Sequence, residues 1–439
     1  MRRRIFGLET EFGVTCAGAA ALDADAAVRR LFRGVQPGGV MNKFLPNGGR
    51  LYLDVGAHPE YATAECDDLV DLVANDEAGV AFYRDMLQVA NAKLREEGSD
   101  CRIHLFKNNI DSVGNSYGCH ENYLVRRRPG FIEKIENTLS FFVTRQIICG
   151  AGYIENTPEG ARYCFSQRSD TMWEGISSGT TRSRPIINTR DEPLANSDLY
   201  RRLHVIAGDS NVAQVSTWLK VGTALLVLDA LERGVSFDDL QLLRPLHAIR
   251  VINHDLSVQT KVELANGRFL TALEIQKEFL DRIDPNYLGE VATTWAKVLE
   301  AIACGDLDKI AAEVDWAAKY RILRRARQKH GWELGSAQIR RLDLAYHDIC
   351  DLGPKMHERG LLRPIVNAAA TQKAKEKAPS TTRANVRGAA IASAQANRLD
   401  LMADWSHLRL QTQETIVIDD PFANTDPRVS ELIEKMETK

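Results

Sequence analysis

The sequence lacks any apolar run long enough to cross a lipid bilayer. Its first four residues, Met1 to Arg4, are basic like the start of a signal peptide. The stretch that follows, residues 5–14, contains Glu9 and Glu11 and therefore offers no apolar segment for export. We expect a cytoplasmic protein. With 439 residues, 44% of them hydrophobic and 26% charged, the chain is long enough for a large core and more than one domain.

Two kinds of binding site are also missing from the sequence. The eight cysteines form no C-x-x-C pair, and no second pair joins Cys101 and His104 to complete a four-ligand zinc set. We expect reduced, buried thiols instead. The 56 Lys and Arg residues face 59 Asp and Glu residues, for a net charge of −3. This balance argues against a general nucleic-acid binder, although a local basic groove remains open.

Neither of the two common nucleotide-binding loops is present. No G-x-x-x-x-G-K-[ST] sequence occurs, and Gly150-Ala151-Gly152 has no third glycine at the dinucleotide spacing. Residues 175–179 match G-x-S-x-G, but a nucleophile elbow needs a helix after it, and residues 180–187 have the pattern of a loop and a strand. A nucleotide site in this chain would therefore be of another type.

What the first half does contain is an alternation of apolar and polar residues. This period of two predicts strands at residues 4–14, 50–55, 103–109, 116–125, 184–189 and 203–208. Helical patterns cover residues 67–97, part of 129–149, 212–233 and most of 272–350. Asn266-Gly267 predicts a hairpin. The whole favours an α+β fold, with antiparallel strands and helices against one face.

A change in composition divides the chain near its end. Residues 368–382 are small, polar and charged, which is typical of a linker. We expect a main domain over residues 1–367, a linker over 368–382, and a small C-terminal domain over 383–439 that packs on the main one because it is too short for a comfortable core of its own.

The first strand places two acids side by side. Because side chains alternate along a strand, Glu9 and Glu11 share a face, with Cα atoms ~7 Å apart. Two carboxylates at that spacing repel each other unless a cation or water separates them, and oxygen ligands suit magnesium. An ordinary solvated strand face is the alternative, since polar faces are common in antiparallel sheets.

The second strand favours a site over that alternative. Arg50, Tyr52 and Asp54 share one of its faces, and Glu60 follows just after the turn. An arginine can hold phosphate through two hydrogen bonds, and a carboxylate can bind a metal or accept a proton. Two strand faces with acids in one chain therefore predict a metal–nucleotide site.

Two further polar groups have undecided roles. His120 lies on a polar strand face and is either a site residue or a hydrogen-bonded sheet histidine. Basic residues around residues 181–184, together with Arg190, Arg202 and the neighbouring His204, could neutralise a triphosphate, or form ordinary surface ion pairs.

Taken together, these motifs resemble the family of Pup ligases and Pup deamidases (depupylases). The similarity runs nearly from end to end of the chain. The segments that carry it are Gly7-Leu8-Glu9-Thr10-Glu11-Phe12-Gly13, residues 47–54, 58–66, 107–109, 120–123, 187–193 and 200–204, Thr381-Thr382-Arg383-Ala384, and Asp404-Trp405.

The resemblance implies a fold and a reaction. The fold would be a glutamine-synthetase-like antiparallel sheet packed with helices, plus a small C-terminal α/β domain. The reaction would use ATP and Mg²⁺ to join the prokaryotic ubiquitin-like protein Pup to lysines of target proteins. The site residues implied are Glu9, Tyr52 and Glu60 at magnesium, Arg50, Thr63 and Trp405 at ATP, and Asp54 as the proton acceptor.

Within this family the chain resembles the ligases more than the depupylases. Depupylases carry a long insertion after the first strand, and residues 14–46 are too few to hold it. Residues 53–58 also resemble the ligase form. A depupylase, or a module that binds Pup without any activity, are the alternatives.

Overall fold

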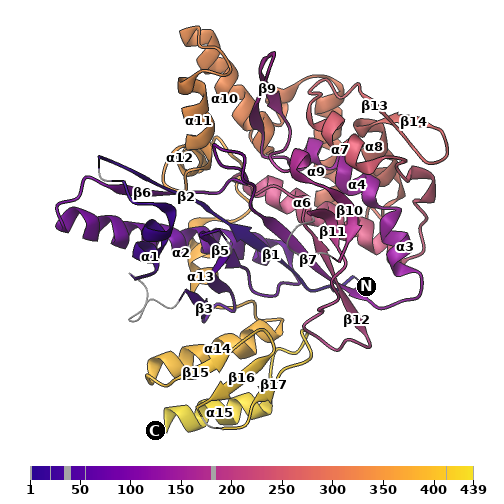
Figure 1. Ribbon diagram of the computed structural model, residues 1–439. Coiled ribbons are helices and arrows are strands. Elements are labelled where there is room, and N and C mark those ends of the chain that lie inside the picture. Colours follow the sequence, from indigo (N-terminus) through magenta and orange to yellow (C-terminus); the bar gives the residue numbers. More distant parts are fainter. Residues whose placement is uncertain are drawn as a thin grey trace.

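The computed structural model describes residues 2–19, 21–33, 41–54, 56–178, 184–411 and 413–438. At its centre lies an eight-stranded sheet in the order β10-β11-β12-β7-β1-β5-β4-β3 (Figure 1). Neighbouring strands are antiparallel except for β10 and β11. The strands are β1 (Phe6–Glu11), β3 (Asn42–Phe44), β4 (Arg50–Asp54), β5 (His58–Ala62), β7 (Cys119–Arg126), β10 (Glu174–Ser177), β11 (Pro185–Asn188) and β12 (Tyr200–Val205).

Strand β1 lies in the middle of this sheet and has two different faces. Phe6 and Leu8 are buried on one face, in the main hydrophobic core. Glu9 and Glu11 point to the other face, where Glu11 lies opposite Glu60 of β5. On the other edge of β1, Glu9 lies opposite His120 of β7. The expectation that the two glutamates share a strand face is therefore confirmed.

Helices cover the apolar face of the sheet. The long helix α2 (Leu69–Glu96) starts at Asp68, whose side chain accepts hydrogen bonds from the backbone N–H groups of residues 70 and 71. A Cβ atom at Gly79 of α2 would lie 2.2 Å from the ring of Tyr61 on β5, so only glycine lets the helix approach this closely. The buried helix α6 (Gln214–Glu232) confirms the apolar helix expected at residues 212–233.

Other helices surround α2 and α6. They are α1 (Ala24–Arg33), α3 (Phe131–Glu136), α4 (Leu139–Thr144), α5 (Gln146–Cys149), α7 (Pro245–Asn253), α8 (Ala272–Arg282), α9 (Gly289–Ala303), α10 (Asp315–His330), α11 (Ala337–His347) and α12 (Leu352–Glu358). Among them, α1, α11 and α12 belong to smaller hydrophobic clusters beside the main core. Together with the antiparallel sheet the helices confirm the α+β class.

Three two-stranded sheets accompany the large one. They are β2 (Gly13–Ala17) with β6 (Arg102–Phe106), β8 (Tyr153–Thr157) with β9 (Gly160–Cys164), and β13 (Lys261–Glu263) with β14 (Phe269–Thr271). The last pair confirms the hairpin expected at Asn266-Gly267. Cys16 of β2 forms a disulfide with Cys101, so the expectation of reduced, buried thiols is wrong for these two. The other six cysteines are free; four are buried, while Cys304 is exposed and Cys350 is partly buried.

The segment expected to be a linker contains a helix. Residues Ala368–Glu376 form α13, which packs on α2, and the Asn47 amide donates to the carbonyl of Ala374 at 2.9 Å. The alanines of this stretch favour a helix, and its lysines stay at the surface, so a polar composition did not mean an extended chain. The division into domains at residues 367 and 383 stays a prediction.

The C-terminal part consists of two helices and a three-stranded sheet (Figure 1). These are α14 (Arg383–Ala396), β15 (Leu401–Ala403), β16 (His407–Leu410), β17 (Ile416–Val417) and α15 (Pro427–Glu437). Val386, Ala390, Leu408, Ile418 and Val429 form a small hydrophobic cluster of their own.

A buried ion-pair cluster joins this part to the large sheet. The carboxylate of Glu65, just after β5, accepts hydrogen bonds from Arg383 Nε at 2.8 Å and from Arg387 Nη1 at 2.9 Å. Arg387 also donates to the carbonyls of Gly48 at 2.7 Å and Trp405 at 2.8 Å. Burial alone raises the pKa of Glu65, but the two arginines outweigh it and lower that pKa to about 2.

In the described part of the chain, no helix is long and apolar enough to cross a membrane.

The Glu65 cluster gives the first testable prediction. Glu65→Gln leaves two buried guanidinium groups without a carboxylate and should lower the free energy of unfolding by about 3–5 kcal/mol at neutral pH. The measurement is urea unfolding. Glu96→Gln, at an exposed position of α2, is the matched control and should change stability by less than about 0.5 kcal/mol.

The pH dependence of the difference in unfolding free energy between the wild-type protein and Glu65→Gln tests whether the ionised Glu65 carboxylate is responsible. Because the folded-state pKa of Glu65 is lowered, its contribution is complete above the unfolded pKa of ~4.3 and is lost as the pH falls from there toward about 2. The gap between the wild-type protein and Glu65→Gln should therefore narrow over that range. A gap that stays constant down to pH 2 would contradict the assignment.

Candidate active site

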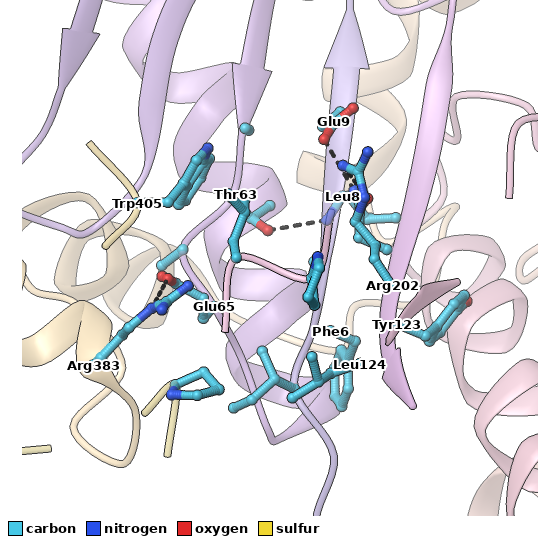
Figure 2. Close-up of a pocket in the computed structure, with 18 residues that line it drawn as sticks. Phe6, Leu8, Glu9, Thr63, Glu65, Tyr123, Leu124, Arg202, Arg383 and Trp405 are labelled. Carbon is cyan, nitrogen blue, oxygen red and sulfur yellow. Dashed lines mark hydrogen bonds and ion pairs between the residues drawn. The ribbon is translucent and has the colours of Figure 1, made fainter. Parts of the chain in front are cut away.

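Glu9 is the centre of a polar network on the open face of the sheet. Its carboxylate accepts a hydrogen bond from the Asn122 amide at 3.1 Å and lies 3.3 Å from His120 Nδ1 and 3.8 Å from His204 Nε2. Arg202 in turn donates to Asn122 at 3.3 Å. Figure 2 shows Glu9 and Arg202 directed toward each other from β1 and β12. Three strands, β1, β7 and β12, thus position one carboxylate.

The network fixes the charge of these groups. Burial raises the pKa of Glu9, but the hydrogen bond with His120 and the charge of Arg202 outweigh it, so the pKa lies well below its usual range. Burial lowers the pKa of His204 to about 3. Glu9 is therefore an ionised carboxylate at neutral pH, and His204 is a neutral ring beside it.

A second acidic group lies next to the first on the same face. The ligand atoms of Glu11, Glu60 and His120 lie within 4.8 Å of one another. Burial and the charges of Glu9 and Glu11 raise the pKa of Glu60 well above its usual range. Three carboxylates so close together are short of positive charge, which a divalent cation with a preference for oxygen ligands would supply.

Tyr52 lies opposite Glu60 in the pairing of β4 with β5. Its hydroxyl is hydrogen-bonded to Glu60, and burial together with the charges of Glu9 and Glu60 raises its pKa well above the usual value. Tyr52 is thus a neutral phenol that orients an acid. The predicted metal set Glu9, Tyr52 and Glu60 comes together on one face, and Glu11 joins it.

Arg50 lies at the other end of this face, close to aromatic rings. Its guanidinium carbon is 4.1 Å from the ring centroid of Tyr52 and 5.5 Å from that of Phe44, and its Nε donates to Asn42 at 2.9 Å. Among the described residues, no carboxylate forms an ion pair with it. Trp405 packs edge-on against Phe44, with centroids 5.1 Å apart. Arg50 therefore has donors free for an anion.

The smaller of two cavities lies between the sheet and the C-terminal part. Figure 2 shows Trp405, Thr63 and Arg383 along one side of it and Arg202 and Glu9 along the other. The hydroxyl of Thr63 accepts a hydrogen bond from the backbone N–H of Leu8 at 3.0 Å, which holds it at the rim. This cavity combines an aromatic ring with cationic groups.

The larger cavity lies on the opposite side of the acids. It is lined by Glu11, Asp54, His58, His120 and Arg168, among others. Asp54 is exposed at the end of β4. Glu9 lines the smaller cavity and Glu11 the larger one, so the two carboxylates of β1 connect the two cavities.

Sequence reasoning placed most of these residues but missed some of their partners. Alternation along residues 116–125 correctly placed Asn122 on the same polar face as His120. Arg168 was not singled out, and neither was Arg387, which holds Trp405. Arg168 and Arg387 lie outside the large sheet, and no local pattern identifies them.

The remaining basic residues divide between the two alternatives. Arg202 belongs to the site. Arg190 forms an exposed ion pair with Glu192 at 2.6 Å, as in the surface-pair alternative. Thr181, Arg182 and Ser183 lie outside the described residues.

Comparison with known proteins decides the family. A family model described as "Pup-ligase protein" matches residues 4–409. The chain belongs to the Pup-ligase family. The Pup–protein ligase of Actinosynnema mirum is 51% identical to it over 99% of both chains. That of Saccharomonospora viridis is 50% identical over 99% of this chain and 100% of its own.

Two solved structures of this Pup-ligase family share the fold. One is the complex between Pup and its ligase PafA, with 39% identity and a TM-score of 0.93 over 100% of this chain and 93% of that chain. The other is the Pup ligase PafA in complex with ADP, with 39% identity and a TM-score of 0.86 over 95% and 94% of the two chains. The family expected from the motifs is thereby confirmed.

The crowding of acids yields a second prediction. Glu60→Gln removes one of three neighbouring carboxylates, so it should raise the melting temperature of the metal-free protein by at least about 1 °C. The same change should abolish the rise in melting temperature that magnesium chloride gives the wild-type protein. Both effects are measured by thermal unfolding with EDTA or with magnesium.

Glu159→Gln, an exposed change in the β8–β9 hairpin, is the control and should leave both quantities unchanged. A Glu60→Gln protein that magnesium stabilises as much as it does the wild type would remove Glu60 from the metal site.

Proposed function

We propose that this chain is an ATP-dependent Pup–protein ligase. It phosphorylates the side-chain carboxylate of the C-terminal glutamate of Pup and joins it by an isopeptide bond to lysines of target proteins, which marks them for proteasomal degradation. One observation carries the proposal: two neighbouring carboxylates of β1 line two cavities, Glu9 a cavity with an aromatic ring and arginines, and Glu11 a second cavity that holds an exposed aspartate. That arrangement suits phosphoryl transfer followed by attack of an amine.

The names of the relatives supply the substrates. The Actinosynnema mirum and Saccharomonospora viridis proteins are named Pup–protein ligases, and PafA has been solved with Pup and with ADP. Because the similarity covers almost the whole chain, we extend Pup and the adenine nucleotide to this protein.

Magnesium fits the donor set on chemical grounds. Glu11 and Glu60 offer carboxylate oxygens beside His120, which also lies against Glu9, and the negative charges of Glu9 and Glu11 raise the pKa of Glu60. We propose that Glu9 and Glu60 hold the ion, with Tyr52 orienting Glu60. When bound, magnesium neutralises phosphate charge.

The smaller cavity would receive ATP. Trp405 provides a flat surface for the adenine ring, and Thr63 lines the same cavity. Arg50, which has no carboxylate partner among the described residues, would hold phosphate oxygens through its planar guanidinium group. The γ-phosphate would then lie over the carboxylate row.

The reaction proceeds in two steps. In the first, a carboxylate oxygen of Pup's C-terminal glutamate attacks the γ-phosphorus, the bond to the bridging oxygen breaks, and ADP and an acyl phosphate result. In the second, a lysine amine attacks the acyl carbon and phosphate leaves. Lysine is mostly protonated at neutral pH, with a pKa of ~10.4, so a base must remove a proton. Asp54 is exposed in the larger cavity and takes that proton.

The length of the segment after the first strand favours ligation over depupylation. The family's depupylases carry a long insertion after the first strand, and residues 14–46 have no room for one. The intact acidic row in turn argues against a Pup-binding module without activity. We also propose that the protein acts in the cytoplasm, and that residues 1–367 form the catalytic domain to which residues 383–439 contribute Trp405.

Mixing the protein with Pup, ATP, magnesium and a lysine-bearing protein tests the reaction directly. A covalent adduct of the two proteins, together with ADP, is the expected result. Cleavage of a preformed adduct without new ligation would make the chain a depupylase. If neither ATP turnover nor an adduct is detected, the chain would be a Pup-binding module without activity.

Asp54→Asn tests the proton acceptor. The amide cannot accept the lysine proton, so conjugation should fall by at least about a hundredfold, within the range of general base catalysis. Nucleotide affinity should stay unchanged because Asp54 lies outside the smaller cavity. Asp400→Asn, an exposed aspartate beside β15, is the control. Conjugation by Asp54→Asn at the wild-type rate would show that Asp54 is not the proton acceptor.

Trp405→Ala tests the nucleotide end. Loss of ring stacking should weaken ADP binding by about 1–3 kcal/mol, or about fivefold to 150-fold in Kd, measured by calorimetry. Trp405→Phe should retain most of the affinity. Trp173, which is 59% exposed on the large sheet, supplies the control change to alanine. Equal affinities for Trp405→Ala and the wild type would exclude the contact.

A further inference from the structure

A helical arm beside the larger cavity carries a concentration of positive charge. Helices α10 and α11 project from the body of the molecule (Figure 1). Residues 321–341, from the second half of α10 to the first turns of α11, contain seven Arg and Lys residues and one acid, Glu333. These leave a formal charge of +6 in a chain whose net charge is −3. We call this segment the basic arm.

Most of this charge is not balanced within the molecule. Arg324 forms an ion pair with Asp308 at 3.1 Å, half-exposed to water. Arg325, Lys329 and Arg341 are exposed, and none of the described carboxylates pairs with them. Basic residues in the last turn of α10 offset its dipole, but that effect accounts for one or two charges and not for seven. Like charges on one surface repel, so the arm has a net unfavourable charge in isolation.

The arm is held in place by an apolar base. Leu323 of α10 and Ile339 of α11 are buried with Ile154 and Tyr163 of the β8–β9 hairpin. The one acid on the inner side of α11, Asp343, is paired with the buried Lys319 at 2.6 Å. The cations therefore lie on helices that are packed against the body of the protein. Asp343 pairs with the buried Lys319 and not with the exposed cations of the arm.

The position of the arm connects it with the reaction. Arg340 and Leu344 of α11 line the larger cavity that also contains Asp54. Any protein that brings a lysine amine to Asp54 must contact the surface around this cavity. Long, flexible cations attract acidic groups over several ångströms without requiring a fixed shape, which suits a surface that has to receive different proteins. Pup, a single sequence, has no need of such tolerance.

We propose that the basic arm is a docking surface for acidic patches on target proteins, so that lysines surrounded by Asp and Glu are modified in preference. The inference rests on the proposed function. A nucleic acid would also be attracted to these cations, but it offers no alkyl amine to the cavity that the arm borders.

The test compares two variants with the same change in charge. Arg325→Glu, Lys329→Glu and Arg341→Glu together reverse the arm. Arg95→Glu, Lys134→Glu and Lys277→Glu together reverse three exposed positions on α2, α3 and α8 and serve as the control. The probes are a small domain with one lysine flanked by glutamates and the same domain with glutamines there.

The arm variant should conjugate the glutamate-flanked probe with a kcat/KM about tenfold lower than the wild type, and the glutamine-flanked probe within about twofold of it. The wild-type preference should shrink as sodium chloride is added, because salt screens exposed charges. The KM for Pup should not change. Equal kcat/KM values for the wild type and the arm variant on the glutamate-flanked probe would overturn the proposal.

A second measurement separates this proposal from the function itself. Binding of the glutamate-flanked probe, measured by fluorescence anisotropy without Pup or ATP, should weaken in the arm variant and not in the control. Unweakened binding would overturn the docking surface even if no conjugate forms. A rise in the KM for Pup alone would assign the arm to Pup, and loss of duplex DNA binding with unchanged conjugation would assign it to nucleic acid; either result overturns the proposal.

Discussion

The pairing register of β1 is the constraint on which the site depends. The strand is hydrogen-bonded to β5 on one side and β7 on the other, and both registers bring Glu9 and Glu11 to the open face. A slip of one residue would bury both carboxylates and expose Phe6 and Leu8. The apolar core behind the sheet therefore selects the register, and the register in turn assembles acids from distant parts of the sequence. The same forces that fold the sheet also concentrate negative charge on one side of it.

The ion-pair cluster at Glu65 determines what lies opposite that charge. Two arginines of α14 converge on a single buried carboxylate, and one of them also holds the carbonyls of Gly48 and Trp405. The guanidinium of Arg387 lies 5.0 Å from the Trp405 ring centroid and 5.6 Å from that of Phe44. The position of the tryptophan at the smaller cavity is thus fixed through a polar contact, although the C-terminal part has an apolar cluster of its own.

Sequence patterns could predict what is local and periodic. Alternation identified the strands that carry Glu9, Arg50 and Tyr52, and it placed the glutamates on one face. It could not show that Glu11 lies opposite Glu60, because strand order is not encoded in a period of two. It also missed the helix at residues 368–376, where alanines and lysines have the composition of a linker and packing against α2 decides the outcome. Arg387 and Arg168 act through tertiary contacts alone, so nothing near them in sequence marks them.

The ion-pair cluster at Glu65 also has a consequence for folding during synthesis. Glu65 and Arg383 are 318 positions apart, and Trp405 comes later still. During synthesis the sheet and its carboxylates leave the ribosome long before the arginines that close the smaller cavity. Until the last eighth of the 439 residues has emerged, the acids are present without their aromatic and cationic counterpart. A nascent or truncated chain therefore carries half a site, and completion of translation is what brings the two halves together.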